Sequence, residues 1–358
     1  MLTQPTRYDK PASGEHAMKA FWDEAALAHT PQFFLMRGTV RPNYEVSARA
    51  LALLEACRGM GLPILTPPAA PLAAIQQVHD TAYLDFLRDA PAAWAAMPQP
   101  GPEVVANMHP SPEMLAQGAK LSANIIGQTG WYTADTSCPI GPDTWRSSLA
   151  AAATALAAAE EAAAGRHAYA LARPPGHHAY AARAGGHCYL NNAGIAAERL
   201  RALGAARVGV LDIDSHHGNG TQGIFWERAD VAFVSVHGDP NFYYPWYVGH
   251  AEERGAGPGE GHNLNLPLPR GTADDAWLAA INTGLAALAD CDALVISLGF
   301  DASRDEPLGF FAITEDGFAR AGAAIAAAGK PCAVVQEGGY NVDVIGTLLT
   351  RFLGGLAG

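Results

Sequence analysis

Five short apolar stretches, each followed directly by a polar and glycine-rich stretch, constrain the fold of this chain more than any other feature. They are rich in β-branched residues, and their apolar character is continuous rather than alternating. Continuous apolar character indicates strands that are buried on both faces, as in parallel sheets. The five stretches are AYALARP (168–174), RVGVLDID (207–214), VAFVSVH (231–237), ALVISLGFD (293–301) and CAVVQEGG (332–339).

Helix-forming segments separate these stretches. Residues 148–164, SLAAAATALAAAEEAAA, consist almost entirely of strong helix formers, and Gly165 follows where a C-terminal cap is expected. The alternation of strands with helices predicts an α/β fold, in which helices cover both faces of an open and mostly parallel sheet. Apolar spacing predicts further helices at 191–203, 274–289 and 314–328.

The domain organisation follows from the same pattern. Because α/β folds often run past about 250 residues as one unit, we expect residues 1–358 to form a single domain. Residues 91–145 differ from the rest, since Pro, Gly, Met and Trp are mixed there without a clean period. We interpret them as a long insertion, which either shapes a pocket mouth or subunit contact, or is an ordinary surface excursion.

Charge and cysteine usage exclude several classes of protein. The 35 acidic and 23 basic residues give a net charge of -12, which argues against nucleic acid or an anionic membrane as partner and favours a small cationic substrate. The five cysteines include no C-x-x-C pair, so we expect neither a disulfide framework nor a thiolate zinc site, but a reducing compartment, the cytoplasm. The N-terminal MLTQPTRYDKPASGEH does not resemble a signal peptide, and no transmembrane span is expected.

The polar stretches lie at the carboxyl ends of the expected strands. Open parallel sheets bind their ligands beyond these ends, so the sequence predicts that the five loops converge on one active site. The loops are PPGHH, DSHHGNG, SVHGD, FDASRDEP and EGGYN.

One of these loops carries metal-binding side chains at regular spacing. Asp212, Asp214 and His216 alternate along an extended backbone, which places them on one side of the strand end. A carboxylate and an imidazole suit a borderline divalent cation, and Asp301, at the end of another strand, is the best candidate for a third ligand. Three protein ligands and a water are typical of catalytic zinc. His217 is interpreted as a packed or hydrogen-bonded residue.

A lone Asp at a strand end more often caps a helix or forms a turn. Here a second histidine pair, His177-His178, follows Pro174-Pro175-Gly176 at yet another strand end, which favours a catalytic interpretation.

Taken in order, five motifs resemble the histone deacetylase family of the arginase-deacetylase superfamily, over roughly residues 20–350. Within that family the chain is most similar to the acetylpolyamine amidohydrolases, through FFLMRGTVRPN (33–43), GQTGWYTADTSCPI (127–140) and the closing EGGYNVDVIGTLLTRFL. The five motifs are RPPGHHA, GGHCYLNN, DIDSHHGNGTQ, SLGFDASRDEPLG and EGGYN.

This resemblance implies a role for each residue of the expected site. Asp214, His216 and Asp301 would bind one zinc ion per subunit, which polarises the amide and lowers the pKa of bound water. His177 and His178 would flank that water, with His178 as general base and then general acid. Tyr340 would donate a hydrogen bond to the developing oxyanion.

The resemblance also implies partners for these groups. Asp212 would orient His177, and Asn219 stands beside His178 where some relatives carry aspartate, which would make His178 a weaker base. A structural potassium ion is also implied, held by backbone carbonyls and by the Ser235 hydroxyl. The residues implied at the potassium site are Asp212, Asp214, His216, Ser235 and Val236.

Substrate recognition departs from the family pattern. The resemblance places His187, Tyr244 and Gly186 along the acyl tunnel, and a histidine makes that wall more polar than an aromatic hydrocarbon would. Leu308 stands where one polyamine-selective class of relatives carries a glutamate that receives the substrate ammonium. Another acid would have to take that role here, and Glu103 and Glu113 in the insertion are the candidates. The alternative is that both are solvated surface carboxylates.

The expected reaction is hydrolysis of an acetyl amide to acetate and a free amine, on acetylated polyamines or related small acetylated amines. Acetyl-lysine in proteins is the alternative substrate. A two-metal ureohydrolase would need a second acid, whereas Phe300-Asp301-Ala302 offers only one. A catalytically silent binding or scaffold protein would not need the complete set of metal ligands, histidines and tyrosine. The resemblance further implies a homodimer formed through the 91–145 insertion.

Overall fold

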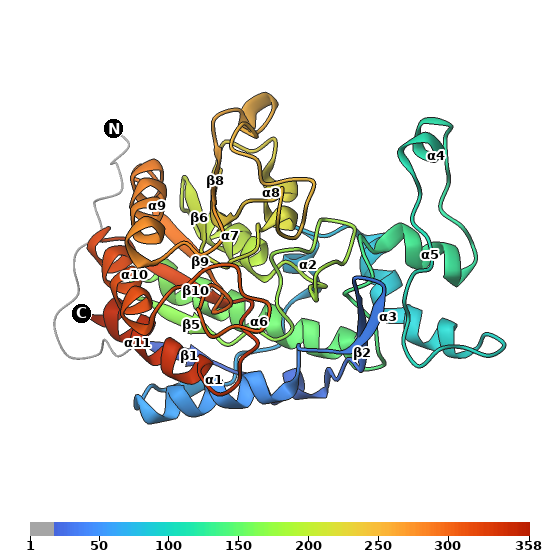
Figure 1. Ribbon diagram of the computed structural model, residues 1–358, viewed down its shortest axis with the longest axis horizontal. Helices are drawn as coiled ribbons and strands as arrows, with labels where there is room; N and C mark the ends of the chain where they lie inside the picture. The colour runs from blue at the N-terminus through green and yellow to red at the C-terminus, as the bar shows by residue number, and fades with distance from the viewer. Residues whose placement is uncertain (1–17) are drawn as a thin grey trace, which may run out of the picture.

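The computed structural model describes residues 18–358, which build a large sheet with helices on both sides (Figure 1). All pairs of neighbouring strands in this sheet are parallel. The α/β prediction is therefore confirmed. In spatial order the strands are β4 (Ile64–Leu65), β1 (Lys19–Phe21), β5 (Ala168–Ala170), β10 (Cys332–Gln336), β9 (Ala293–Leu298), β6 (Val208–Asp212), β7 (Val231–Gly238) and β8 (Asn263–Leu268).

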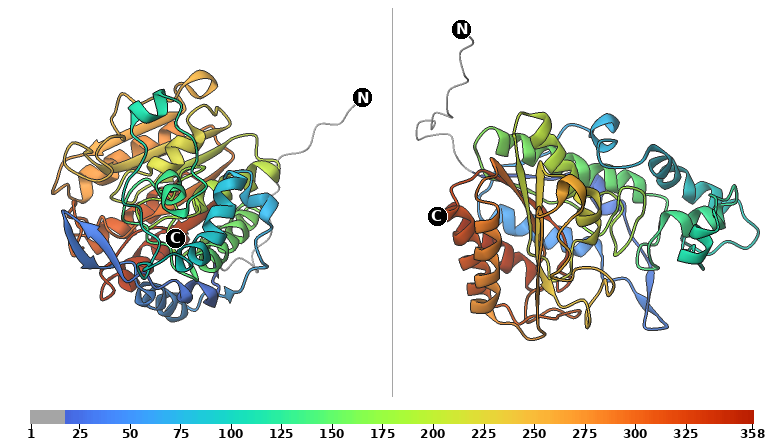
Figure 2. Two further views of the ribbon diagram at one scale, coloured as in Figure 1. Left: turned by 90° about the vertical axis from the view of Figure 1, so that its right-hand side faces the viewer. Right: turned by 90° about the horizontal axis from the view of Figure 1, so that it is seen from above.

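Successive residues of each strand enter two different hydrophobic cores. In β9, Leu294 and Ile296 pack on one side of the sheet, whereas Ala293 and Val295 pack on the other. Figure 2 shows the two layers of helices on opposite sides of the strands. Burial of both faces explains why the strand sequences are continuously apolar. One layer contains α6 (Thr144–Ala163) and α7 (Asn192–Ala202), and the other contains α1 (Ser47–Gly59), α9 (Asp274–Ala287), α10 (Glu315–Ala327) and α11 (Ile345–Ala357).

The predicted helices are present with small shifts at their ends. Helix α6 begins at Thr144, four residues before its expected start, because its first turn is polar and lacks the alanine signal. It ends at Ala163, and Gly165 follows with a φ of 82°, the left-handed conformation of a C-terminal glycine cap. The alanines of α6 let it lie close against the sheet.

Four of the five strands are shorter than their apolar stretches, and β7 is one residue longer. Strand β9 ends at Leu298 and β6 at Asp212, so Asp214 and Asp301 lie in the loops beyond. Because the polar ends of the stretches leave the ladder, their side chains can turn toward one another.

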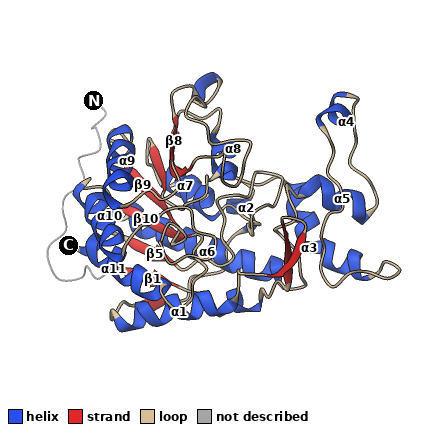
Figure 3. Ribbon diagram, viewed as in Figure 1, coloured by secondary structure: helices blue, strands red, loops and turns tan. Residues whose placement is uncertain are grey.

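Several elements were not predicted from the sequence. No strand was expected at β1, β4 or β8, and no helix at α1 or α11. The antiparallel hairpin of β2 (Phe33–Met36) and β3 (Thr39–Pro42) was not expected either. Figure 3 shows this hairpin apart from the main sheet.

The segment expected as an insertion at 91–145 projects away from the sheet in Figure 1, with α4 and α5 standing out from the rest. Its boundaries are less sharp than expected, since α3 runs to Ala95 and α6 begins at Thr144. The base of the segment shares a third core with α6 and α7, in which Tyr132 and Ile140 are buried. The division of 1–358 into one domain with an insertion stays a prediction. The helices here and beside the site are α2 (Leu72–Ile75), α3 (Thr81–Ala95), α4 (Pro112–Ala116), α5 (Ile125–Tyr132) and α8 (Asn219–Phe225).

Other expectations concern the chain as a whole. Residues 1–16, in which no signal peptide is expected, lie outside the described residues. Between residues 18 and 358, no helix combines the length and apolarity needed to cross a bilayer. The five cysteines are buried and unpaired.

Candidate active site

The loops after β6 and β9 bring three metal-binding side chains together. The Nδ1 atom of His216 lies 2.9 Å from Oδ2 of Asp301 and 3.2 Å from Oδ1 of Asp214. Ligand atoms of the three residues lie within 4.8 Å of one another, and all three side chains are buried. The three ligands expected from the sequence therefore form one cluster at the carboxyl end of the sheet.

The electrostatics of this cluster fit a divalent cation. Burial and the nearby Asp214 raise the pKa of Asp301, which means that two buried carboxylates repel each other. Burial lowers the pKa of His216, but the carboxylates of Asp301 and Asp214 outweigh it and raise that pKa to about 9. A cluster that attracts positive charge so strongly, with one nitrogen and two carboxylate donors, suits zinc.

Glycines allow the carboxylates to approach the backbone closely. A Cβ atom at position 299 would lie 1.9 Å from Oδ2 of Asp214, and one at 338 would lie 2.3 Å from Oδ2 of Asp301. The Gly338 N–H donates to Asp214 at 2.8 Å. Any larger residue at these two positions would displace one of the two carboxylates, so both glycines are needed for the cluster to form.

The histidine pair lies beside the cluster, and each ring has its own orienting group. Nδ1 of His177 lies 2.9 Å from Oδ2 of Asp212, and Nδ1 of His178 lies 2.6 Å from Oδ1 of Asn219. The two ring centroids are 4.0 Å apart. Both partners expected from the sequence are therefore in contact with the expected histidines.

The two imidazoles differ in their affinity for protons. Burial lowers the pKa of His177, but the carboxylates of Asp212 and Asp214 outweigh it and raise that pKa to about 10. Burial, together with the charges of His177 and His216, lowers the pKa of His178 well below its ordinary value. His178 is therefore neutral at pH 7 and available as a base.

Tyr340 lies on the loop that follows β10, beside the metal ligands. Its ring centroid is 5.8 Å from that of His187 and 4.7 Å from the Arg49 guanidinium carbon. Gly339 has a φ of 110°, and a Cβ there would lie 2.7 Å from Cβ of Phe300, so only glycine fits before the tyrosine.

Two of the residues expected along the tunnel, Tyr244 and Gly186, lie against His178. The Tyr244 ring meets the His178 ring edge-on at 4.9 Å, and a Cβ at position 186 would lie 2.3 Å from Cδ2 of His178. His187 is buried and adopts a φ of 67°, and its ring also meets that of Phe34 at 5.6 Å. Phe34 comes from the β2-β3 hairpin, which the sequence pattern did not connect with the site.

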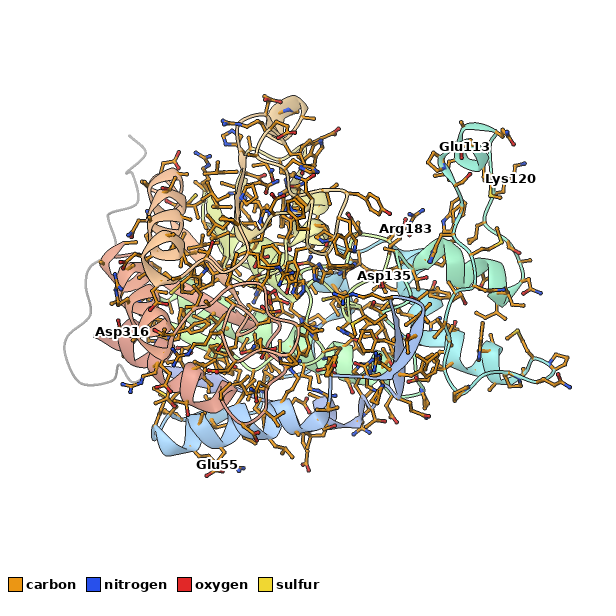
Figure 4. All side chains as sticks on the ribbon, in the orientation of Figure 1. Glu55, Glu113, Lys120, Asp135, Arg183 and Asp316 are labelled. Carbon is orange, nitrogen blue, oxygen red and sulfur yellow. The ribbon has the colours of Figure 1, made fainter. Side chains whose placement is uncertain are left out.

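Asp135 contacts two of these expected tunnel residues, and this acid was not predicted from the sequence. Oδ2 of Asp135 accepts hydrogen bonds from the Tyr244 hydroxyl at 2.5 Å and from the Gly186 N–H at 3.1 Å. Figure 4 shows Asp135 near the base of the projecting segment. Its only sequence signal is its place in the YTADTSCPI stretch that carries part of the family resemblance.

The two acids proposed for ammonium recognition lie elsewhere. Glu103 is buried and accepts hydrogen bonds from the Gln32 N–H at 3.1 and 3.2 Å, so its carboxylate holds a loop. Glu113 is exposed on α4, toward the far end of the projecting segment (Figure 4). The structure does not bring either acid into contact with the histidine pair or the metal ligands.

The residues expected around potassium lie on β6 and β7 and in the loop that follows β6. Asp212 and Ser235 face each other across the β6-β7 ladder, and Val236 follows within β7. The Ser235 hydroxyl lies 2.8 Å from Nδ1 of His237. His217 is buried with Nε2 at 3.1 Å from Oε1 of Gln222, which agrees with its interpretation as a hydrogen-bonded residue.

Charged residues buried next to the site were also not predicted. Glu45 pairs with Arg49 at 2.7 Å and with Arg173 at 2.8 Å, and Arg49 donates to the carbonyls of Gly339 and Glu337. The available signal was the Glu45/Arg49 spacing of four residues, directly ahead of the apolar positions of α1.

Comparison with known proteins gives consistent matches over nearly the whole chain. A model of the histone deacetylase domain matches residues 43–356. An acetylpolyamine amidohydrolase of Burkholderia pseudomallei is 45% identical over 331 residues, covering 91% of this chain and 95% of the relative. Another from Mycoplana ramosa is 39% identical and covers 95% of this chain and 100% of the relative. The crystal structure of an acetylpolyamine aminohydrolase from Burkholderia pseudomallei has a TM-score of 0.91 at 43% identity, covering 95% of this chain and 99% of that one.

Proposed function

The chain belongs to the histone deacetylase family, and we propose that it hydrolyses the acetyl amide of small acetylated amines, acetylated polyamines above all. One observation carries the proposal. Three buried metal donors, a neutral histidine and a tyrosine, delivered by loops far apart in the sequence, meet at one end of the sheet. The full-length similarity to acetylpolyamine amidohydrolases supports the choice of substrate.

Asp214, His216 and Asp301 would hold a single zinc ion, as their donor set indicates. When bound, the cation supplies Lewis-acid activation of the amide carbonyl and of water. The Phe300-Asp301-Ala302 segment holds one acid where a two-metal ureohydrolase would need two, which supports a one-metal enzyme.

His178 has the geometry of the proton carrier. Because its Nδ1–H donates to Asn219, the Nε2 atom carries the lone pair and can take a proton from the attacking water. The same nitrogen then returns the proton to the departing amine. His177, held by Asp212, adds positive charge beside the developing oxyanion, to which the Tyr340 hydroxyl donates a hydrogen bond.

Substrate choice follows from charge and access. The net charge of -12 and the Asp135 carboxylate at the tunnel wall favour a cationic amine. Tyr244, Gly186 and His187 form the walls, and the projecting segment would restrict entry to thin, linear substrates.

The assembly and location of the protein are part of the proposal. Exposed apolar side chains on the projecting segment support a homodimer formed through it, and the Asp212/Ser235 pairing supports a structural potassium ion. The unpaired thiols fit the cytoplasm. The exposed apolar residues of the segment are Met108, Met114, Leu115, Leu121 and Ile126.

The test is a substrate panel assayed at low salt with metal-replete enzyme. We expect turnover of N-acetylputrescine and acetylated polyamines to exceed that of N-butylacetamide, which has the same chain length but no ammonium. Comparable rates on acetylated histone peptides would favour the protein acetyl-lysine alternative. Activity should disappear on chelation and return with about one zinc per chain. A metal ratio near two would support a ureohydrolase, and no hydrolysis of any acetyl amide would support a silent binding protein.

A further inference from the structure

Glu306, in the loop after β9, contacts the backbone that carries Tyr340. Its Oε1 atom accepts hydrogen bonds from the Tyr340 N–H at 2.7 Å and from the Asn341 N–H at 2.8 Å. The residue is 8% exposed, and its Oε2 atom is buried without a hydrogen-bond partner among the described residues. One oxygen of this buried carboxylate accepts hydrogen bonds from two consecutive backbone amides. The carboxylate is therefore placed to hold a loop rather than to interact with solvent.

Glu306 is itself fixed by two turns of its own loop. Its N–H donates to the Ser303 carbonyl at 3.3 Å, and its carbonyl accepts from the Gly309 N–H at 3.0 Å. The side chain of Asn341 returns to this loop and donates to the Asp305 carbonyl at 2.7 Å. The carboxylate is therefore presented from a rigid segment, which a positioning group requires.

The Tyr340 loop is held from its other side by a cation. Nε of Arg49 donates to the Gly339 carbonyl at 2.5 Å, and its Nη2 donates to the Glu337 carbonyl at 2.7 Å. The amides on one flank of the loop thus contact a carboxylate, and the carbonyls on the other contact a guanidinium. Within residues 18–358 the Tyr340 hydroxyl has no hydrogen-bond partner. Its position therefore depends on the hydrogen bonds that Glu306 and Arg49 make to the backbone of its loop, and on packing of its ring against Arg49.

We infer that Glu306 is a positioning residue of the hydrolytic reaction, which holds the Tyr340 hydroxyl where the substrate oxyanion develops. This inference rests on the proposed function and names a group that acts through Tyr340 rather than touching the substrate. Without the carboxylate, two buried amides lose their acceptor, and the loop keeps only its Arg49 contacts. A shift of the hydroxyl by about 1 Å is enough to lower turnover by roughly 10²-fold.

Three variants separate this role from a general effect on folding. Glu306→Ala removes the acceptor, Glu306→Gln keeps a neutral oxygen at the same reach, and Asp305→Asn removes an exposed neighbouring charge as a matched control. On N-acetylputrescine we expect Glu306→Ala to lower kcat by about 10- to 100-fold with KM within about threefold. Glu306→Gln should recover part of that loss, and Asp305→Asn should resemble the unmodified enzyme, with zinc content unchanged in all three.

The decisive measurement is a double-mutant cycle with Tyr340→Phe. If Glu306 acts through the tyrosine hydroxyl, Glu306→Ala should lower kcat less than about twofold in the Tyr340→Phe background. A full 10- to 100-fold loss in that background would overturn the inference, because the carboxylate would then act on something else. An inactive parent enzyme would refute the proposed function instead.

Hydrogen exchange supplies a readout that does not need residual activity. The amides of Tyr340 and Asn341 should exchange faster in Glu306→Ala than in the parent, while amides of β9 and β10 keep their protection. Unchanged exchange at these two amides would also overturn the inference, whatever the kinetics show.

Discussion

Replacing Gly186 by alanine tests the placement of the catalytic histidine most directly. The new Cβ would lie 2.3 Å from Cδ2 of His178 and 2.9 Å from the Tyr244 hydroxyl, whereas ordinary contacts begin near 3.4 Å. The His178 ring must therefore retreat by about 1 Å, against its hydrogen bond to Asn219, and a displacement of that size costs roughly 10²-fold in rate. Gly186 has a φ of 53°, so alanine adds about 1–2 kcal/mol of backbone strain.

Gly165→Ala is the matched control for this strain. Gly165 has a φ of 82°, and a Cβ added there would have no atom within 4 Å, so alanine costs stability without a clash. We expect Gly186→Ala to lower kcat/KM on N-acetylputrescine by about 10²-fold with zinc retained, and Gly165→Ala to leave it unchanged while lowering the unfolding midpoint. A Gly186→Ala enzyme that folds, binds zinc and keeps kcat/KM within about threefold of the parent would refute the proposed placement of His178.

The remaining predictions concern other groups of the site. Tyr340→Phe should keep its zinc but lose about 10²- to 10³-fold in kcat, and near-normal turnover would remove the hydroxyl from the mechanism. Asp301→Ala should lose its zinc on dialysis, so a variant that still held one metal per chain would contradict the ligand assignment. Asn219→Asp places a carboxylate 2.6 Å from Nδ1 of His178 and should raise the depressed pKa of that imidazole. Because His178 must be neutral to accept a proton, the acidic limb of kcat/KM should move to higher pH, and an unmoved limb would count against His178 as the base.

The sequence predicted that Asp214, His216 and Asp301 lie together because Asp214 and Asp301 each end a continuous apolar stretch. In a parallel sheet that pattern alone places Asp214 and Asp301 at one edge, whichever strands are neighbours. The structure adds that β6 and β9 pair directly, which explains how close the two carboxylates lie. The contacts of Asp212 with His177 and of Asn219 with His178 were expected from the family resemblance and not from spacing, and both are present.

Residues that reach the site from distant segments could not be predicted in this way. Arg49 contacts Gly339 across 290 positions of sequence, and Asp135 contacts Tyr244 across 109. Neither residue follows an apolar strand, so no local pattern separates it from a solvated charge. The short strand β1 was missed for a related reason, since three residues carry too little pattern and only pairing with β4 and β5 defines them.

The roles expected for Glu103 and Glu113 stay predictions. Both were selected for their charge and for lying in a segment that could reach the tunnel, but charge alone does not fix where a side chain points. The Glu103 carboxylate accepts hydrogen bonds from the Gln32 N–H, and Glu113 is exposed to solvent. Their proposed role in ammonium binding has no contact in the structure to support it, whereas Asp135 has two.

The position of β10 has a consequence for biosynthesis. Although it leaves the ribosome after every other strand, it lies between β5 and β9 and is the only strand that joins β4-β1-β5 to β9-β6-β7-β8 in the ladder of residues 18–358. A chain that ended just before residue 332 would still contain Asp214, His216 and Asp301. It would lack the strand that pairs with both β5 and β9, so the sheet would form as two separate parts. Such a truncated chain would also lack the Gly338 N–H that donates to Asp214, and Tyr340 with it.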